Sequence, residues 1–165
     1  MKVYISGKIG EEVISEATRQ KFAKAEKILK AKGFEVFNPC DEQWQEVLRD
    51  SYLYSYFDKA RAIPACSVSF YTYALLRDLM VLSTKDAVLM LEDWKDSEGA
   101  QAEYKFAKAA KKKIFFASEK DAINELWSIA QSVNPDIQKM NLSKGIKMCE
   151  EYSKLHKEEV WIQVK

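Results

Sequence analysis

The carboxylate of Glu103 is the side chain whose surroundings in the sequence most favour chemistry. It lies in the stretch DWKDSEGAQAE, and small or apolar residues follow it at helical spacing, at Phe106, Ala107 and Ala110. Because residues three, four and seven apart share one helix face, Glu103 is predicted to face the interior of the protein. A carboxylate there is costly unless it is paired or functional. A solvated glutamate at the border of that face is the alternative, and it fits the pattern equally well.

A second carboxylate, Asp78, lies among the apolar residues Leu75, Leu79 and Leu82 of a predicted helix, in the stretch RDLMVLSTKDAV. Two carboxyl groups that meet in one pocket can cleave a glycosidic bond, since one attacks the anomeric carbon and the other transfers protons. The pattern alone does not bring Asp78 and Glu103 together. Whether they meet depends on the elements that carry them.

The N-terminal stretch ISGKIG is a candidate anion site. Ser6, Gly7, Lys8 and Ile9 follow a short apolar run, and the amides of a strand-to-helix turn, together with a lysine, can hold a phosphate or a sugar hydroxyl. A triphosphatase loop is excluded because isoleucine follows Lys8 in place of serine or threonine, and a dinucleotide fingerprint is incomplete with only Gly7 and Gly10 present. An ordinary turn without a ligand is the alternative.

A second polar turn carries Ser97 and Gly99 at the predicted start of the helix that contains Glu103. The first amides of a helix lack intrahelical partners and favour an anion. This turn is therefore another candidate for binding the charged or polar part of a ligand.

Short apolar runs alternate with helical segments, and these elements must position the candidate residues. Apolar runs with β-branched and aromatic side chains predict four strands, at 2–6, 34–37, 87–91 and 114–117. Helical spacing predicts helices over 15–32, about 71–82 and 100–110, and Gly33 offers the left-handed cap that ends the first. The order gives two βαβ units with parallel strands. The prediction is a three-layer, doubly wound parallel sheet of the α/β class, with ligands at the carboxyl ends of its strands.

The remaining segments are less regular. Residues 41–73 carry many aromatic side chains without a clean period, which predicts short helices and loop. Ser118 and Asp121 resemble a capping box that begins a further helix, to about residue 132.

The tail contains a predicted helix over about 143–157, followed by apolar residues that alternate at 160, 162 and 164. The alternation predicts either a fifth strand or an arm that reaches a neighbouring subunit. We therefore divide the chain into a domain of residues 1–135 and a C-terminal helical and strand extension of residues 136–165, packed on that domain or on a neighbouring subunit.

Composition narrows the class of protein. The chain has 165 residues, 47% of them hydrophobic, and 26 basic and 25 acidic side chains give a net charge of +1, so no overall field draws nucleic acid or an anionic membrane. No apolar run approaches the roughly 18 residues of a membrane span, and the N-terminus lacks a secretory pattern. Three separated cysteines without a CxxC pair predict neither a metal site nor a disulfide framework. We expect a cytoplasmic protein that binds neither nucleic acid nor membrane.

Four stretches taken together resemble the nucleoside 2-deoxyribosyltransferase superfamily: YISG in the first strand, NP after the second, RDL followed by KDAV, and W-x-x-S-x-G-A-x-x-E. Their order and spacing over about residues 1–118 are similar to those of the small deoxyribosyltransferase-like domains of bacteria and phages. The resemblance implies a flavodoxin-like fold, cleavage of an N-glycosidic bond without a metal or organic cofactor, and a homodimer or larger assembly.

The same resemblance implies roles for individual residues. Glu103 would be the nucleophile, Asp78 the acid/base and substrate-orienting residue, and Tyr4 the neighbour that sets the orientation or ionisation of Glu103. Ser97, six residues before Glu103, stands where the 2'-deoxynucleoside 5'-phosphate N-hydrolases bind phosphate and the nucleoside transferases carry an acid. The other implied contacts are a phosphate cradle and one flanking aromatic residue, contributed by Gly7, Lys8, Ile9, Gly99 and Trp94.

Several alternatives stay open at the level of sequence. The small-molecule partner is a nucleoside or its 5'-monophosphate, and the intermediate is captured either by water, in a hydrolase, or by a second base, in a transferase. The alternative to an enzyme is a nucleotide-binding or sensing module that uses the same pocket without turnover. The presence of two inward carboxylates favours the enzyme.

Overall fold

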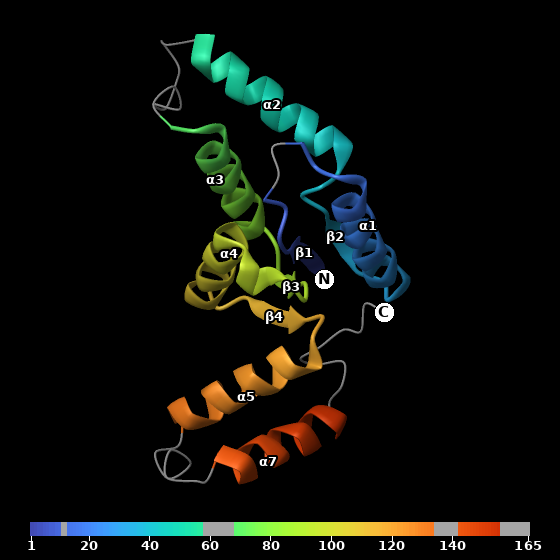
Figure 1. Cartoon of the computed structure of the whole chain (residues 1–165), viewed down its shortest axis with the longest axis vertical. Helices are drawn as coiled ribbons and strands as arrows, with labels where there is room; N and C mark the ends of the chain where they lie inside the picture. The colour runs from blue at the N-terminus through green and yellow to red at the C-terminus, as the bar shows by residue number, and fades with distance from the viewer. Residues whose placement is uncertain (11–12, 58–67, 134–141, 156–165) are drawn as a thin grey trace.

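A parallel sheet of four strands forms the centre of the described chain (Figure 1). The computed structural model describes residues 1–10, 13–57, 68–133 and 142–155. The strands follow the order β2-β1-β3-β4, and each neighbouring pair is parallel. Their bounds are β1 (Lys2–Ser6), β2 (Glu35–Phe37), β3 (Ala87–Met90) and β4 (Lys113–Phe116). The four predicted strands are therefore confirmed to within one residue at each end.

Helices cover both faces of this sheet, which gives the three layers of a flavodoxin-like α/β fold. α1 (Glu16–Ala31) lies on one face, and α3 (Phe70–Ser83) and α4 (Glu98–Ala109) lie on the other (Figure 1). β1 leads through α1 to β2 at one edge, whereas its other neighbour, β3, leads through α4 to β4 at the opposite edge. The prediction of a doubly wound parallel sheet is confirmed. In sheets of this type, ligands are expected at the carboxyl ends of the strands where the order reverses, which here are β1 and β3.

The side chains of β1 alternate between the two cores. Val3 and Ile5 belong to the core shared with α1, whereas Tyr4 belongs to the core shared with α3 and α4. Successive side chains of a strand face opposite sides of the sheet, so Ser6 lies on the same side as Tyr4. Both are fully buried. A buried serine requires a hydrogen-bond partner, and α4 is the helix that covers this side.

Two predicted helix ends are found in the structure. Gly33 follows α1 with a φ of 82°, the left-handed conformation that glycine adopts most readily. α5 (Glu119–Val133) begins after Ser118, whose hydroxyl oxygen accepts a hydrogen bond from the amide of Asp121 at 3.3 Å. Local sequence signals thus decide where these helices end and begin.

The prediction of short helices and loop after residue 41 was wrong. Residues Glu42–Phe57 form one helix, α2, of 16 residues. Its inward side chains, Trp44, Leu48 and Tyr52, are spaced four apart; Leu48 is only 1% exposed, and the rings of the other two pack on aromatic neighbours. Exposed apolar side chains elsewhere on the helix hid this period in the sequence.

The C-terminal helices α5 and α7 (Leu142–Leu155) pack as an antiparallel pair (Figure 1). Gly145 makes their close approach possible, because a Cβ atom there would lie 2.0 Å from the ring of Trp127. The described part of the extension therefore packs on α5. The predicted strand at 160–164 lies outside the described residues.

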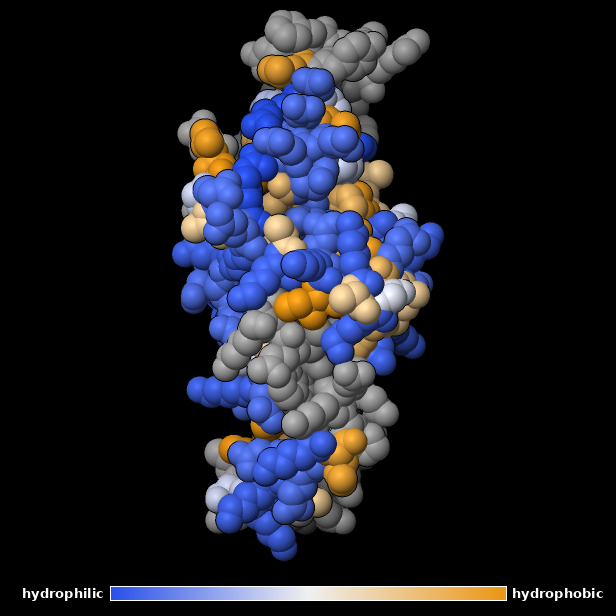
Figure 2. Space-filling view, turned by 90° about the vertical axis from the view of Figure 1, so that its right-hand side faces the viewer, coloured by the Kyte–Doolittle hydropathy of each residue, from blue (hydrophilic) through white to orange (hydrophobic). Residues whose placement is uncertain are grey.

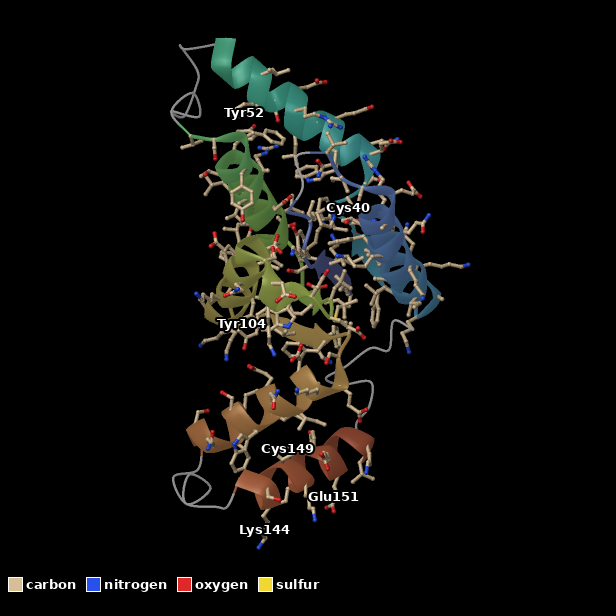
Figure 3. All side chains as sticks on the ribbon, in the orientation of Figure 1. Cys40, Tyr52, Tyr104, Lys144, Cys149 and Glu151 are labelled. Carbon is tan, nitrogen blue, oxygen red and sulfur yellow. The ribbon has the colours of Figure 1, made fainter. Side chains whose placement is uncertain are left out.

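Figure 3 shows how α7 divides its side chains. Cys149 lies between α5 and α7, whereas Lys144 and Glu151 point away from α5. Figure 2 shows a mostly hydrophilic face of the molecule with separate hydrophobic patches. Across the described parts of the chain, no helix is long and apolar enough to span a membrane.

Candidate active site

Glu103 is buried where α4 packs on the sheet. The helix begins after Ser97, whose hydroxyl oxygen accepts a hydrogen bond from the amide of Ala100 at 3.3 Å, as expected of a strong N-cap residue. Ala100 and Ala107 belong to the core beneath the helix, and Glu103 lies between them on the same face with 6% of its surface exposed. A solvated position for this carboxylate is therefore excluded.

Two hydroxyl groups of β1 hold the Glu103 carboxylate. The Tyr4 hydroxyl donates to Oε1 at 2.6 Å, and the Ser6 hydroxyl donates to Oε2 at 2.5 Å. Burial raises the pKa of Tyr4 well above its ordinary value, so its phenol remains a protonated donor. Each carboxylate oxygen therefore accepts one bond from the central strand and keeps lone pairs for a reaction. Ser6, singled out above as part of a ligand-binding turn, instead positions Glu103.

Asp78 is held in a similar way from a different element. It lies on the inner face of α3 with 9% of its surface exposed. The indole N–H of Trp44, on α2, donates to its Oδ1 at 3.0 Å. One carboxyl oxygen of Asp78 is thus bound by the protein, and Oδ2 is the oxygen left for a ligand.

Glu103 and Asp78 line one cavity of about 480 Å³ at the carboxyl ends of β1 and β3. The turn after β1 and the start of α4 contribute other parts of its wall. The cavity brings together six residues singled out from the sequence: Gly7, Ile9, Asp78, Ser97, Gly99 and Glu103. Residues distant in the chain therefore meet at the edge of the sheet where a ligand was predicted.

Burial raises the pKa of both carboxyl groups. The pKa of Glu103 rises to about 7 through desolvation, and the hydrogen bonds from Ser6 and Tyr4 oppose the rise. The pKa of Asp78 rises to about 8, first through desolvation and then through the charge of Glu103, while the bond from Trp44 and a neighbouring arginine oppose it. Desolvation therefore disfavours the charged form of both carboxyl groups, and the charge of Glu103 further disfavours ionisation of Asp78.

Two residues expected at the site lie elsewhere. Trp94, in the short 3-10 helix Trp94–Asp96, does not line the cavity; its indole packs on Tyr104 and Phe116 and donates to Asp121 Oδ2 at 3.2 Å. The large ring fills core space between β4 and α5 instead of flanking a ligand.

Lys8 is exposed and does not line the cavity either, although Gly7 and Ile9 on each side of it do. Its amide donates to Asp93 Oδ1 at 3.2 Å, and Lys21 pairs with Asp93 Oδ2 while donating to the Lys8 carbonyl at 2.8 Å. Asp93 and Lys21 together clamp the turn after β1 onto the end of β3. The sequence did not indicate this clamp, because a surface lysine and a loop aspartate are common.

The close fit of this turn depends on Gly7. A Cβ atom there would lie 3.0 Å from Leu91 Cβ and 3.2 Å from Asp93 Oδ1. Gly99, in the first turn of α4, leaves room for Tyr71, whose hydroxyl oxygen would lie 3.1 Å from a Cβ atom at that position. Both glycines therefore permit close contacts in the cavity wall.

Trp44 and Tyr71 were missed as site residues. Both belong to the aromatic segment for which the sequence predicted short helices and loop, and each reaches the site only through the approach of α2 and α3 to the sheet edge. The aromatic excess in 41–73 was the available signal. Among the described residues, no group of three or more His, Cys, Asp and Glu side chains is arranged to hold a metal ion.

Comparison with known proteins gives one match. No curated protein and no solved structure matches the chain. The family model described as Domain of unknown function (DUF4406) matches residues 1–116, the part that runs from β1 to the last residue of β4 and contains every residue of the cavity. The chain therefore belongs to this family, whose description assigns no function.

Proposed function

We propose that this protein cleaves the N-glycosidic bond of a nucleoside or deoxynucleoside, or of its 5'-monophosphate, with Glu103 as nucleophile. The observation that carries the proposal is a fixed, buried Glu103 carboxylate on the wall of the same cavity as a buried Asp78. Both carboxyl groups have raised pKa values, which suits a pair that shares its work between an ionised nucleophile and a protonated acid. The resemblance to the nucleoside 2-deoxyribosyltransferase superfamily supports the same interpretation.

In the first step, a Glu103 oxygen forms a bond to C1' of the sugar as the bond from C1' to the base nitrogen breaks. The electron pair of that bond leaves with the base, and Asp78 donates its proton to the base nitrogen. Tyr4 and Ser6 keep the attacking carboxylate in position. The products of this step are a free base and a covalent glycosyl-enzyme.

In the second step, water attacks C1', gives a proton to the Asp78 carboxylate, and displaces Glu103. Both carboxyl groups return to their starting protonation states, and two displacements at C1' retain its configuration. If a second base replaces water as the nucleophile, the same intermediate yields a transferase. The residues in the site serve both outcomes.

The cavity suits a ligand of this kind. Small-molecule sites measure roughly 300–1,000 Å³, and this cavity measures about 480 Å³. Ser97 and Gly99 place the start of α4 in its wall, where amides favour a phosphate or a hydroxyl group. Phe70 and Tyr71 add aromatic surface suited to a planar base. We assign the sugar 5' end to the start of α4 and the base to the aromatic wall.

The test is base release from a panel of ribo- and deoxynucleosides and their 5'-monophosphates, with and without an acceptor base, followed by chromatography. Glu103→Gln removes the nucleophile in a side chain of similar shape, and we expect it to lower the rate roughly a thousandfold or more. The control is Glu119→Gln, an exposed glutamate at the start of α5 that does not line the cavity, which should retain full activity.

Each outcome has a distinct meaning. Base release without an acceptor assigns a hydrolase, and base exchange that requires an acceptor assigns a transferase. Activity that survives in Glu103→Gln contradicts the role of Glu103. Binding of a nucleotide without turnover of any substrate contradicts the enzyme and assigns a sensing module.

A further inference from the structure

Trp44 reaches the candidate active site from α2, outside the elements that carry the two carboxylates. Its indole N–H donates to Oδ1 of Asp78 at 3.0 Å. The ring packs edge-on against Phe37, with centroids 5.1 Å apart, and Phe37 stacks on Tyr4 at 5.5 Å. Aromatic packing therefore fixes the indole and connects it to the residue that holds Glu103.

The chemistry of this hydrogen bond is asymmetric. An indole N–H can only donate, so it occupies Oδ1 as an acceptor and leaves Oδ2 of Asp78 to carry the proton. When Asp78 gives that proton up, its carboxylate becomes charged, and hydrogen bonds to ionised groups are roughly twice as strong as those between neutral groups. The contact is thus stronger after proton transfer than before it, which is the condition for lowering a reaction barrier.

We propose that Trp44 is a positioning residue of this site: it fixes Asp78 so that Oδ2 delivers the proton to the departing base, and it stabilises the carboxylate that remains. The inference rests on the proposed function. The Oδ2 proton moves to the base nitrogen as the electron pair of the C1'–N bond leaves with the base. The attacking water later returns a proton to Oδ2, so Asp78 ends the cycle as it began.

Other charged and titratable groups that face Asp78 also shift its pKa. Glu103 on α4 raises the pKa of Asp78, and Arg77 on α3 lowers it. Tyr4 on β1 remains neutral, since its own pKa is raised by burial and by both carboxylates. The Trp44 bond lowers the pKa of Asp78, because it favours the charged form. Loss of the N–H should therefore raise the pKa of Asp78 further.

The experiment compares Trp44→Phe with Trp94→Phe. Both changes keep an aromatic ring and remove an indole N–H that donates to a buried aspartate, at Asp78 in the first case and at Asp121 in the second. Only the first aspartate lines the cavity. Rates of base release are measured from pH 5 to 10 with the best substrate of the panel, after circular dichroism has shown that both variants are folded.

We expect Trp44→Phe to lower kcat about tenfold and to move the basic limb of the pH profile to higher pH, because Asp78 holds its proton longer. Trp94→Phe should leave kcat and both limbs unchanged. A purely structural role for Trp44 would lower the amount of folded enzyme without moving the limb. An unshifted basic limb in folded Trp44→Phe overturns the proposal.

A second measurement does not depend on activity. In a ¹H–¹⁵N spectrum of the unchanged protein, the indole resonance of Trp44 should titrate with an apparent pKa near 8, that of Asp78, and Asp78→Asn should abolish the titration. The indole resonance that is missing from the spectrum of Trp44→Phe is that of Trp44. If this variant does not fold, the indole resonance that changes in Asp78→Asn identifies Trp44. A Trp44 indole chemical shift that does not change with pH overturns the role of Trp44 alone. Absence of turnover by the unchanged protein overturns the proposed function.

Discussion

The hydroxyl group of Tyr4 donates to Oε1 of Glu103 at 2.6 Å, although the two residues are 99 positions apart in the chain. The contact exists because β1 is a central strand and α4 packs across its buried face. Ser6 adds the second donor from the same side of the strand. The orientation of Glu103 is therefore a property of the packed sheet and helix together.

Tyr4→Phe tests this contact. The change keeps the ring that stacks on Phe37 and removes the hydroxyl group. In the unchanged protein, the hydrogen bond from that hydroxyl favours the ionised form of Glu103. Its loss should raise the pKa of Glu103 above about 7, move the acidic limb of the pH profile to higher pH, and lower kcat/KM about tenfold to a hundredfold. Tyr52→Phe is the control, since that hydroxyl donates to the Val68 carbonyl. An unmoved acidic limb would show that Tyr4 does not tune Glu103.

The free energy of unfolding should fall as the pH rises from about 5 to about 8. Burial raises the pKa of Glu103 to about 7 and of Asp78 to about 8, whereas carboxyl groups in an unfolded chain titrate near pH 4. Over this range the folded protein binds more protons than the unfolded chain, so stability decreases with pH. Each group contributes at most about 1.4 kcal/mol per pH unit.

Asp78→Asn should flatten this dependence, because asparagine cannot ionise yet can still accept the hydrogen bond from Trp44. Urea unfolding at several pH values measures the effect, and we expect the largest gain in stability relative to the unchanged protein near pH 8. Asp96→Asn, at an exposed position, is the control and should leave the slope unchanged. Equal slopes in the protein and in Asp78→Asn would exclude a raised pKa for Asp78.

Gly7→Ala should disturb the turn after β1. The added methyl group would lie 2.9 Å from Leu91 Cδ1 and 3.2 Å from Asp93 Oδ1, an overpacking that costs about 1–3 kcal/mol. Because Gly7 lines the cavity, KM should rise as well. Gly33→Ala is the comparison: it strains a φ of 82° but has no neighbouring atom within 4 Å, so it should lower the melting temperature without changing KM. A normal KM in Gly7→Ala would place the ligand away from this turn.

Gly145→Ala should separate the C-terminal helices without affecting the site. A Cβ atom there would lie 2.0 Å from the Trp127 ring, so α7 cannot keep its present distance from α5. We expect faster proteolysis within α7, measured by mass spectrometry, with base release unchanged. Lys144→Ala, on the side that points away from α5 (Figure 3), should behave like the unchanged protein. Lost activity in a folded Gly145→Ala would connect this helix pair to catalysis.

The parts of the structure with strong local signals could be predicted from the sequence. The apolar runs gave the four strands, Gly33 gave the end of α1, and the spacing after Glu103 gave its inward position. Each of these depends on a few adjacent residues or on one helix face. Their parallel order then placed the cavity at one edge of the sheet.

Contacts that depend on the approach of separate elements could not be predicted. The bond between Trp44 and Asp78 requires α2 to pack beside α3, and the sequence of α2 obscures its own period. Trp94 precedes the start of α4 as expected, but nothing local shows whether its ring turns toward a ligand or toward Phe116. A large ring moves to where the core has space, and that space is set by the whole fold.

The two-faced pattern of β1 has a consequence for how this chain can vary. A shift of one residue in the pairing of β1 would turn Tyr4 and Ser6 toward α1 and bring valine and isoleucine beneath the buried glutamate, which would then lose both donors at once. Under the proposed function, mispaired molecules would lack the fixed nucleophile even if they were compact. Base release, if it is measured, would therefore report whether β1 pairs with its neighbours in the correct register. Single-residue insertions in this strand should reduce that activity far more than substitutions at its ends.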